Sequence, residues 1–199
     1  MKNKKTIISI VIVLIVLIII GALVYLYYNN NKNENIKYNI NMEPTPLSET
    51  ESTVSSEGYG ATGALEDSNL TILDMLTYAV QDEYLAHGEY EAIIEKFGNQ
   101  RPYTNIILSE ETHLSYLKEI YESYNLSFPE DESNSHIVVP ETLLEAAETG
   151  VKAEEDNIAM YEKFLTYNLP ESVKDVFTIL RDGSENHLKA FQNQVNKLS

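Results

Sequence analysis

Four segments of this chain carry apolar residues at alternating spacings of three and four, and this periodicity constrains the fold more than any other feature. The segments cover residues 73–97, 103–124, 144–165 and 173–198. Such spacing places the apolar side chains on one face of an α-helix, which then needs other helices to cover it. Helices of about 25 residues are near 38 Å long. The pattern therefore predicts an all-α fold with one helical core.

The connections between the four segments indicate how the helices follow one another. The first and third connections are short, whereas residues 125–139 are polar and could span roughly 50 Å when extended. This order is typical of a four-helix bundle with one long crossover between helices 2 and 3. We expect residues 67–69 to cap the first helix, and Pro140 and Pro170 to lie in the first turns of the third and fourth.

The first 28 residues predict a single transmembrane helix. Lys2, Lys4 and Lys5 precede an apolar run of 23 residues, 6–28, which would be roughly 34 Å long as a helix. Basic residues on the short N-terminal side favour a cytoplasmic N-terminus, so the rest of the chain would lie outside the cell membrane. A cleaved signal peptide is the alternative, but it normally has a shorter apolar region and a small-residue cleavage site.

Composition separates a tether from a folded domain. Residues 29–69 are polar with few apolar side chains, which predicts a flexible tether, and the bundle would then cover 70–199. The net charge of −17 disfavours nucleic acid and anionic lipid headgroups, since both are bound chiefly through Lys and Arg. Cations are its natural small partners, and solubility is the other explanation of the charge. Without cysteine, a metal would need oxygen and nitrogen ligands.

Polar residues interrupt all four apolar faces near the middle of each segment. They are Glu83 and His87, Glu110 and His113, Glu154, and Ser184 and His187. Because the midpoints of matched helices lie at one level, these side chains should share one buried layer. No Lys or Arg occupies the faces, and a buried carboxylate without a partner costs several kcal/mol. A metal ion would neutralise the layer; the alternative is a hydrogen-bonded network with protonated carboxylates.

The spacing within this layer suits a metal. Glu110 and His113 share a helix face and can reach one ion. They form the Glu-x-x-His pair of di-iron and di-manganese carboxylate bundles, in which two single Glu ligands come from the other two helices. Glu83 and Glu154 would be those ligands, with His187 as a second nitrogen ligand.

Three further polar residues accompany the single carboxylates. Tyr90 follows Glu83 by seven residues, and Tyr161 follows Glu154 by seven. Packing in the core is the default for both tyrosines, and hydrogen bonding to the carboxylates is the alternative. Asn157, one turn after Glu154, is a further candidate for the layer.

Two similar phrases show that the chain repeats one helix hairpin, with one change. SEETHLSYL at 109–117 and GSENHLKAF at 183–191 align His113 with His187, but Ser184 stands where the first phrase has Glu110. The ligand set is thus one carboxylate short. His87, one turn from Glu83, could compensate, or the site could hold a single metal with an open position.

Three stretches resemble the ferritin-like superfamily, specifically a branch catalogued as domain of unknown function 2202. They are LRDGSENHLKAF at 180–191, NIILSEETHL at 105–114 and GVKAEEDNIAMY at 150–161. The resemblance covers about residues 70–199, and the Gly-Ser-x-Asn-His phrase is typical of the branch. It implies a four-helix fold with a metal layer formed by Glu83, Glu110, His113, Glu154 and His187.

We therefore expect a membrane-anchored, outward-facing domain that binds one or two iron or manganese ions. Oxidase or peroxide-consuming chemistry is the expected reaction class, with Ser184 leaving room for water or an oxidant. The alternative is a non-enzymatic module that binds metal for storage or stability, or presents a helical face to a partner. The expected partners are metal ions and the membrane, and no binding of nucleic acid is expected. The chain could also form a homodimer.

Overall fold

The computed structural model describes residues 58–199, and this part of the chain is all-helical. Its five α-helices are α2 (Gly60–Glu66), α3 (Ile72–Phe97), α4 (Tyr103–Ser123), α5 (Leu143–Phe164) and α6 (Glu171–Leu198), and η1 (Ser133–Ser135) is a 3-10 turn. No strand occurs between residues 58 and 199, so the all-α prediction is confirmed. The predicted anchor, residues 1–28, lies outside the described residues. Among the helices described, none has the length and apolar character needed to cross a membrane.

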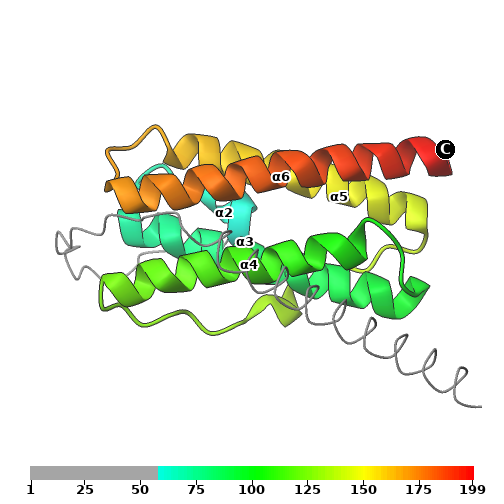
Figure 1. Cartoon of the computed structure of the whole chain (residues 1–199), viewed down its shortest axis with the longest axis horizontal. Helices are drawn as coiled ribbons and strands as arrows, with labels where there is room; N and C mark the ends of the chain where they lie inside the picture. The colour runs from blue at the N-terminus through cyan, green and yellow to red at the C-terminus, as the bar shows by residue number, and fades with distance from the viewer. Residues whose placement is uncertain (1–57) are drawn as a thin grey trace, which may run out of the picture. The chain divides into compact units, whose positions relative to one another are not determined.

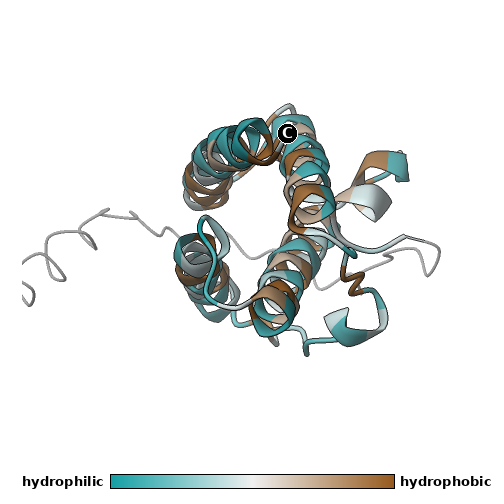
Figure 2. Ribbon diagram, turned by 90° about the vertical axis from the view of Figure 1, so that its right-hand side faces the viewer, coloured by the Kyte–Doolittle hydropathy of each residue, from teal (hydrophilic) through white to brown (hydrophobic). Residues whose placement is uncertain are grey.

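The four long helices lie side by side (Figure 1). α3 packs mainly on α4, and α5 on α6, while contacts of α4 with α6 and of α3 with α5 complete a ring. Seen along the helices, the four are grouped around a common centre (Figure 2). The long connection between α4 and α5 runs beside α3: the backbone N–H of Val138 donates to Glu89 and Nζ of Lys96 donates to the carbonyl of Pro140. It therefore brings the chain back along α3 before α5 begins.

Side-chain caps define where α3 and α5 begin. The Thr71 hydroxyl accepts from the backbone N–H of Asp74, and the Asp74 carboxylate accepts from the backbone N–H of Thr71, which satisfies two N–H groups that the helix leaves free. The same reciprocal pair, Thr142 with Glu145, starts α5. The expectation that residues 67–69 cap the first long helix is wrong, because Thr71 takes that position.

The prolines behave differently at the two later helices. α6 begins directly after Pro170, so this proline is the N-cap residue and lies one position before the predicted first turn. Pro140 lies three residues before Leu143, the first residue of α5, so it is in the connection and not in the first turn of the helix.

Aromatic side chains pack the core on both sides of the helix midpoints. Tyr90, Tyr103 and Phe191 form one cluster, with ring centroids 5.4–6.0 Å apart. Phe164 and Phe177, 5.2 Å apart, belong to the other, together with Tyr161. The middle level of the helices therefore lies between two apolar layers that exclude water from it.

A short helix lies within the segment that composition predicts to be tether. α2 packs against α3 and α5, and its small residues Gly60, Ala61, Gly63 and Ala64 are buried. Nζ of Lys163 on α5 donates to the carbonyls of Ala64 (2.7 Å) and Leu65 (3.3 Å) at its C-terminal end. A Gly- and Ala-rich stretch has the composition of a linker, but small side chains also let a helix approach its neighbours closely, and here they do.

Candidate metal centre

The five predicted metal ligands meet in one buried layer at the middle of the long helices. They come from all four helices: Glu83 from α3, Glu110 and His113 from α4, Glu154 from α5 and His187 from α6. Their exposed fractions range from 1% to 7%, so bulk water does not solvate these groups. No lysine or arginine is buried among the described residues. The charges of the layer must therefore be balanced from within it or by a bound cation.

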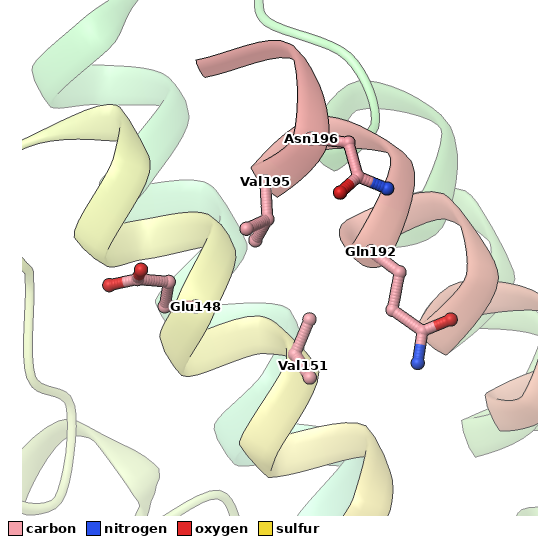
Figure 3. A pocket seen from close by; sticks show the side chains of 5 residues that line it. All are labelled: Glu148, Val151, Gln192, Val195 and Asn196. Atoms are coloured by element: carbon pink, nitrogen blue, oxygen red, sulfur yellow. The ribbon is translucent and has the colours of Figure 1, made fainter. Parts of the chain in front are cut away.

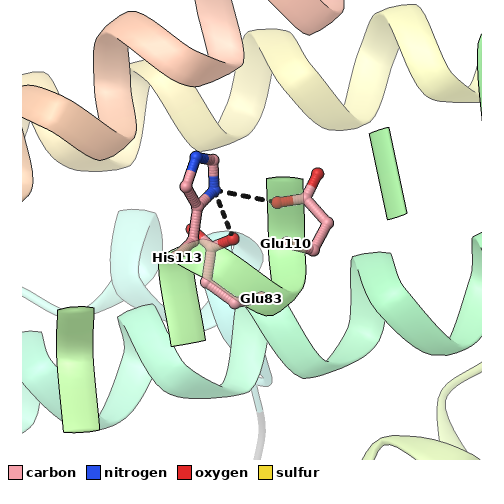
Figure 4. A group of neighbouring side chains, drawn as sticks. All are labelled: Glu83, Glu110 and His113. Atoms are coloured by element: carbon pink, nitrogen blue, oxygen red, sulfur yellow. Dashed lines mark hydrogen bonds and ion pairs between the residues drawn. The ribbon is translucent and has the colours of Figure 1, made fainter. Parts of the chain in front are cut away.

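The first of two ligand groups combines α3 and α4. Nδ1 of His113 lies 3.0 Å from Oε2 of Glu83 and 2.9 Å from Oε2 of Glu110 (Figure 4). One ligand atom from each of the three residues falls within 4.8 Å of the others. An ion placed among them would replace the imidazole proton that now lies between the carboxylates.

The second group combines α4, α5 and α6. Nδ1 of His187 lies 3.2 Å from Oε1 of Glu110 and 3.5 Å from Oε1 of Glu154, and again the three ligand atoms fall within 4.8 Å of one another. These contacts lack hydrogen-bond geometry, so Nδ1 of His187 is a buried polar atom without a hydrogen-bond partner. Such an atom is costly unless something occupies the space before it. Glu110 belongs to both groups.

Two tyrosines hold the single carboxylates, each from the opposite hairpin. The Tyr161 hydroxyl donates to Oε1 of Glu83 at 2.7 Å, and the Tyr90 hydroxyl donates to Oε1 of Glu154 at 2.9 Å. Hydrogen bonds of this kind fix the orientation of carboxylate ligands in metal sites. Tyr90 and Tyr161, each seven residues after a glutamate, therefore do more than pack the core. Because α3 and α5 run in opposite directions, each tyrosine reaches the carboxylate of the other helix.

Ser184 lies at the level of the layer but belongs to neither ligand group. Its hydroxyl is 2.5 Å from Oδ1 of Asn157 and 3.1 Å from the carbonyl of Leu180. The Asn157 amide in turn donates to Oδ2 of Asp82, whose Oδ1 accepts the backbone N–H of Ala61 at 2.7 Å. The sequence did not indicate Asp82, because the helical period places it off the inner face that Glu83 occupies.

His87 does not join the layer. Its Nε2 lies 3.7 Å from a carboxylate oxygen of Glu111 on α4, and its side chain is 29% exposed. The structure thus makes His87 part of neither ligand group.

A small cavity lies inside the polar layer. Its volume is about 20 Å³, and it is lined by Asp82, Glu83, Ala86, Tyr90, Glu110, Ala153, Glu154, Asn157 and Ser184. A polar cavity needs roughly 10–15 Å³ to hold a water molecule. This one is therefore large enough for one water or a ligand of similar size, and it borders carboxylates of both ligand groups.

A larger groove elsewhere has different properties. It measures about 380 Å³ and lies between α5 and α6, lined by Glu148, Val151, Gln192, Val195 and Asn196 (Figure 3). Only one of these side chains is ionisable, so the groove lacks the convergent acid, base or ligand groups of a chemical site. The small polar cavity is the better candidate.

Gly183, in the second of the repeated phrases, makes room for the first histidine. A Cβ atom at Gly183 would lie 2.6 Å from Nε2 of His113, which is closer than such atoms approach. The phrase Gly-Ser-x-Asn-His therefore combines a small residue that accommodates His113 with His187, which faces Glu110 and Glu154.

The pKa values of the layer reflect burial and the pairing of its charges. Burial would raise the pKa of Glu110, but the neighbouring imidazoles of His113 and His187 outweigh it and hold that pKa well below its usual range. Burial lowers the pKa of the two histidines, but the carboxylates outweigh this and raise it to about 10 for His113 and about 9 for His187. Burial raises the pKa of Glu83 to about 8. Without metal, the histidines are thus cationic at neutral pH and compensate Glu110.

The donor set fits a transition metal. Carboxylate oxygens and imidazole nitrogens are ligands that suit iron, manganese and zinc, and the metal must displace the protons that these groups carry. His187 offers an Nδ1 atom that has no hydrogen-bond partner and lies near carboxylate oxygens of Glu110 and Glu154. Two groups that share Glu110 can hold one ion or two.

Comparisons with known proteins identify relatives of this helical domain. A family model described as "Uncharacterized protein domain (DUF2202)" matches residues 73–198. The "Uncharacterized protein MJ0754" of Methanocaldococcus jannaschii is 29% identical over 133 residues, which cover 58% of this chain and 70% of that protein. A crystal structure titled "hypothetical protein MJ0754 from Methanococcus jannaschii DSM 2661" superposes with a TM-score of 0.58 at 23% identity, over 66% of this chain and 85% of that one. The last similarity supports the fold.

Proposed function

Since this chain belongs to the family described as an uncharacterized protein domain (DUF2202), we propose its function from the site itself: a ferritin-like four-helix bundle that binds one or two iron or manganese ions. The observation that carries this proposal is the pair of ligand groups that share Glu110, with the unpartnered Nδ1 of His187 facing the second group. Glu83, Glu110 and His113 would hold one ion, and Glu110, Glu154 and His187 the other.

We further propose oxidase or peroxide-consuming chemistry at this centre. A bound iron or manganese ion would supply one-electron redox chemistry and Lewis acidity. The chain itself contributes three functions: Tyr90 and Tyr161 orient the carboxylates, the aromatic layers exclude bulk water, and the cavity beside Ser184 admits one small molecule. An organic substrate would not fit a space of about 20 Å³.

Peroxide turnover tests the catalytic part of this proposal. The full-length chain is loaded with ferrous iron without oxygen, hydrogen peroxide is added, and both peroxide loss and iron oxidation are followed. We expect one round of iron oxidation, in which two ferrous ions reduce each peroxide to water, and repeated turnover once ascorbate is added as the electron donor. Glu110→Gln should abolish both, and Glu111→Gln, the neighbouring exposed residue, should retain them. Bound iron that reacts no faster than free iron would leave only a non-catalytic role.

The second candidate is a non-enzymatic module, and the charge balance of the layer favours it. The cationic histidines neutralise carboxylates even without metal, so the layer could serve the stability of the fold or simple metal storage. Metal that binds but never turns over peroxide would select storage or stability.

The proposed location is the outer face of the cell membrane, with residues 6–28 as the anchor. The reasons are the apolar run and the preceding lysines. Cell fractionation of the full-length chain and of a version without residues 1–28 tests this. The full chain should pellet with membranes and the shortened one should not; equal distribution of the two would exclude the anchor.

A further inference from the structure

Four carboxylates, not three, border the small cavity. Glu83, Glu110 and Glu154 belong to the two ligand groups, and Asp82 is the fourth. The complete ligand set of a carboxylate bundle has a fourth carboxylate at the position of Ser184. The cavity therefore holds the number of carboxylates of a complete site, with one of them supplied by a different helix.

A chain of hydrogen bonds connects this fourth carboxylate with the altered position. Asp82 on α3 accepts from the amide of Asn157 on α5, and Oδ1 of Asn157 lies 2.5 Å from the hydroxyl of Ser184 on α6. On its other side, Asp82 is fixed by the backbone N–H of Ala61, 2.7 Å away. Both oxygens of the Asp82 carboxylate thus accept hydrogen bonds, and Asn157 links this carboxylate to Ser184.

The internal repeat shows that these residues depart from symmetry together. The two copies of the repeat can be aligned on Glu83 and Glu154. Three residues after these glutamates, Asn157 aligns with Ala86. One residue before them, Ala153 aligns with Asp82. Asp82, Asn157 and Ser184 therefore break the repeat at three positions, and all three line one cavity.

We propose that Asp82 replaces the missing fourth carboxylate, acting through Asn157 and Ser184 on a water molecule that fills the cavity and completes the metal's ligands. The cavity of about 20 Å³ exceeds the roughly 10–15 Å³ that one water requires. Nδ1 of His187, in a side chain that is only 9% exposed, has no hydrogen-bond partner, which independently points to a ligand in the layer. Asp82 is thus a positioning residue. This inference rests on the proposed metal-binding function.

Metal affinity of the full-length chain tests the proposal, with Mn²⁺ as the probe. Asp82→Asn keeps the shape of the side chain but removes its charge. Residues that orient a ligand typically change metal affinity about 10- to 100-fold, and we expect a loss of that size. Asp175→Asn, the same substitution at an exposed position of α6, is the matched control and should bind as the wild type does.

A rescue variant gives a result that a merely structural role would not produce. In the Asp82→Asn background, Ser184→Glu places a carboxylate directly at the altered position, and we expect it to restore the affinity. The visible absorption spectrum of bound Co²⁺ should change in Asp82→Asn and return toward the wild-type form in the double variant. Wild-type affinity and an unchanged spectrum in Asp82→Asn would overturn the proposal.

Misfolding of the Asp82→Asn variant and a wild type that binds no metal can be distinguished from failure of the proposal. If Asp82→Asn fails to fold, Asn157→Ala removes the hydrogen bonds between Asp82 and Ser184 while Asp82 keeps its hydrogen bond from Ala61. The Asn157→Ala chain should then lose Mn²⁺ affinity by a similar factor. Wild-type affinity in Asn157→Ala would overturn the proposal. If the wild-type chain binds no Mn²⁺ or Co²⁺, the proposed function fails and this inference fails with it. Loss of the inference alone requires a wild type that binds metal and Asp82 variants that bind equally well.

Discussion

Glu110 is the residue on which both ligand groups depend, because the two histidines approach it from different helices. His113 contacts one of its carboxylate oxygens at 2.9 Å and His187 the other at 3.2 Å. Each remaining carboxylate faces one histidine, and a tyrosine from the opposite hairpin fixes it. The positions of these side chains therefore depend on the two tyrosines and on the space beside His113.

Removal of one tyrosine hydroxyl should destabilise the metal-free chain. Tyr161→Phe leaves Oε1 of Glu83 buried without its 2.7 Å hydrogen bond. An unsatisfied buried group of this kind costs about 1–3 kcal/mol. Urea unfolding should show a loss of that size, with little change in Tyr116→Phe, a half-buried tyrosine of α4. Equal unfolding midpoints for wild type and Tyr161→Phe would contradict the role of this hydrogen bond.

Gly183→Ala should weaken both the fold and the metal site, although alanine favours helices. The new Cβ would lie 2.6 Å from Nε2 of His113, so the imidazole must move. Overpacking costs about 1–3 kcal/mol, which outweighs the gain of about 1 kcal/mol from helix propensity. Thermal unfolding and Mn²⁺ titration measure the two effects. Asn186→Ala, exposed on the same helix, is the control; a Gly183→Ala chain that is more stable than wild type would refute the close contact.

For the long helices, the apolar periodicity of the sequence predicts where each helix runs and which of its faces points to the core. The apolar faces follow the core, so the predicted segments 73–97 and 103–124 correspond to α3 (Ile72–Phe97) and α4 (Tyr103–Ser123). Periodicity also places Glu83 and Glu110 on inner faces, where the structure has them. It cannot detect α2, whose burial depends on small residues fitting against α3 and α5, nor Asp82, whose partner Asn157 is fixed by how α5 lies beside α3.

The attachment of α2 should depend on Lys163. Its ammonium group donates to the carbonyls of Ala64, Leu65 and Asp67 near the end of α2, where cations are favourable. Lys163→Met retains the length of the side chain but cannot donate. We expect amide hydrogen exchange in residues 60–66 to become faster, with no change in Lys174→Met on the exposed face of α6. Unaltered exchange in Lys163→Met would show that apolar packing alone holds α2.

At the scale of the whole molecule, an acidic chain with a net charge of −17 contains a core layer that balances its charge internally when no metal is present. The two histidines provide the positive charge, since no lysine or arginine is buried among residues 58–199. A metal ion would take over that role and release the protons. The stability of the metal-free domain should therefore respond to pH through the layer.

The metal-free chain should lose stability as the pH rises above neutral. The carboxylates overcome burial and raise the pKa of His113 to about 10 and of His187 to about 9, above the value of about 6.5 in an unfolded chain. A raised pKa stabilises the fold below the unfolded value, and this contribution is lost as the pH passes the folded value. Glu83, whose pKa burial raises to about 8, changes in the same direction.

Urea unfolding after removal of metal by a chelator measures this dependence. The midpoint should fall between neutral pH and about pH 10, and the fall should be shallower when His113 and His187 are both replaced by glutamine. That double variant controls for lysines and tyrosines, which also titrate at high pH. An equally steep fall in the variant would mean that the layer does not cause it.

Metal content per chain measures whether the two ligand groups that share Glu110 bind metal. The full-length wild type, Glu110→Gln and Glu111→Gln are each loaded with ferrous iron or Mn²⁺, passed over a desalting column and analysed by mass spectrometry. We predict one or two ions per chain in the wild type and in Glu111→Gln, and none in Glu110→Gln, because Glu110 belongs to both groups. A wild type without metal, or a Glu110→Gln chain with full occupancy, would contradict the account.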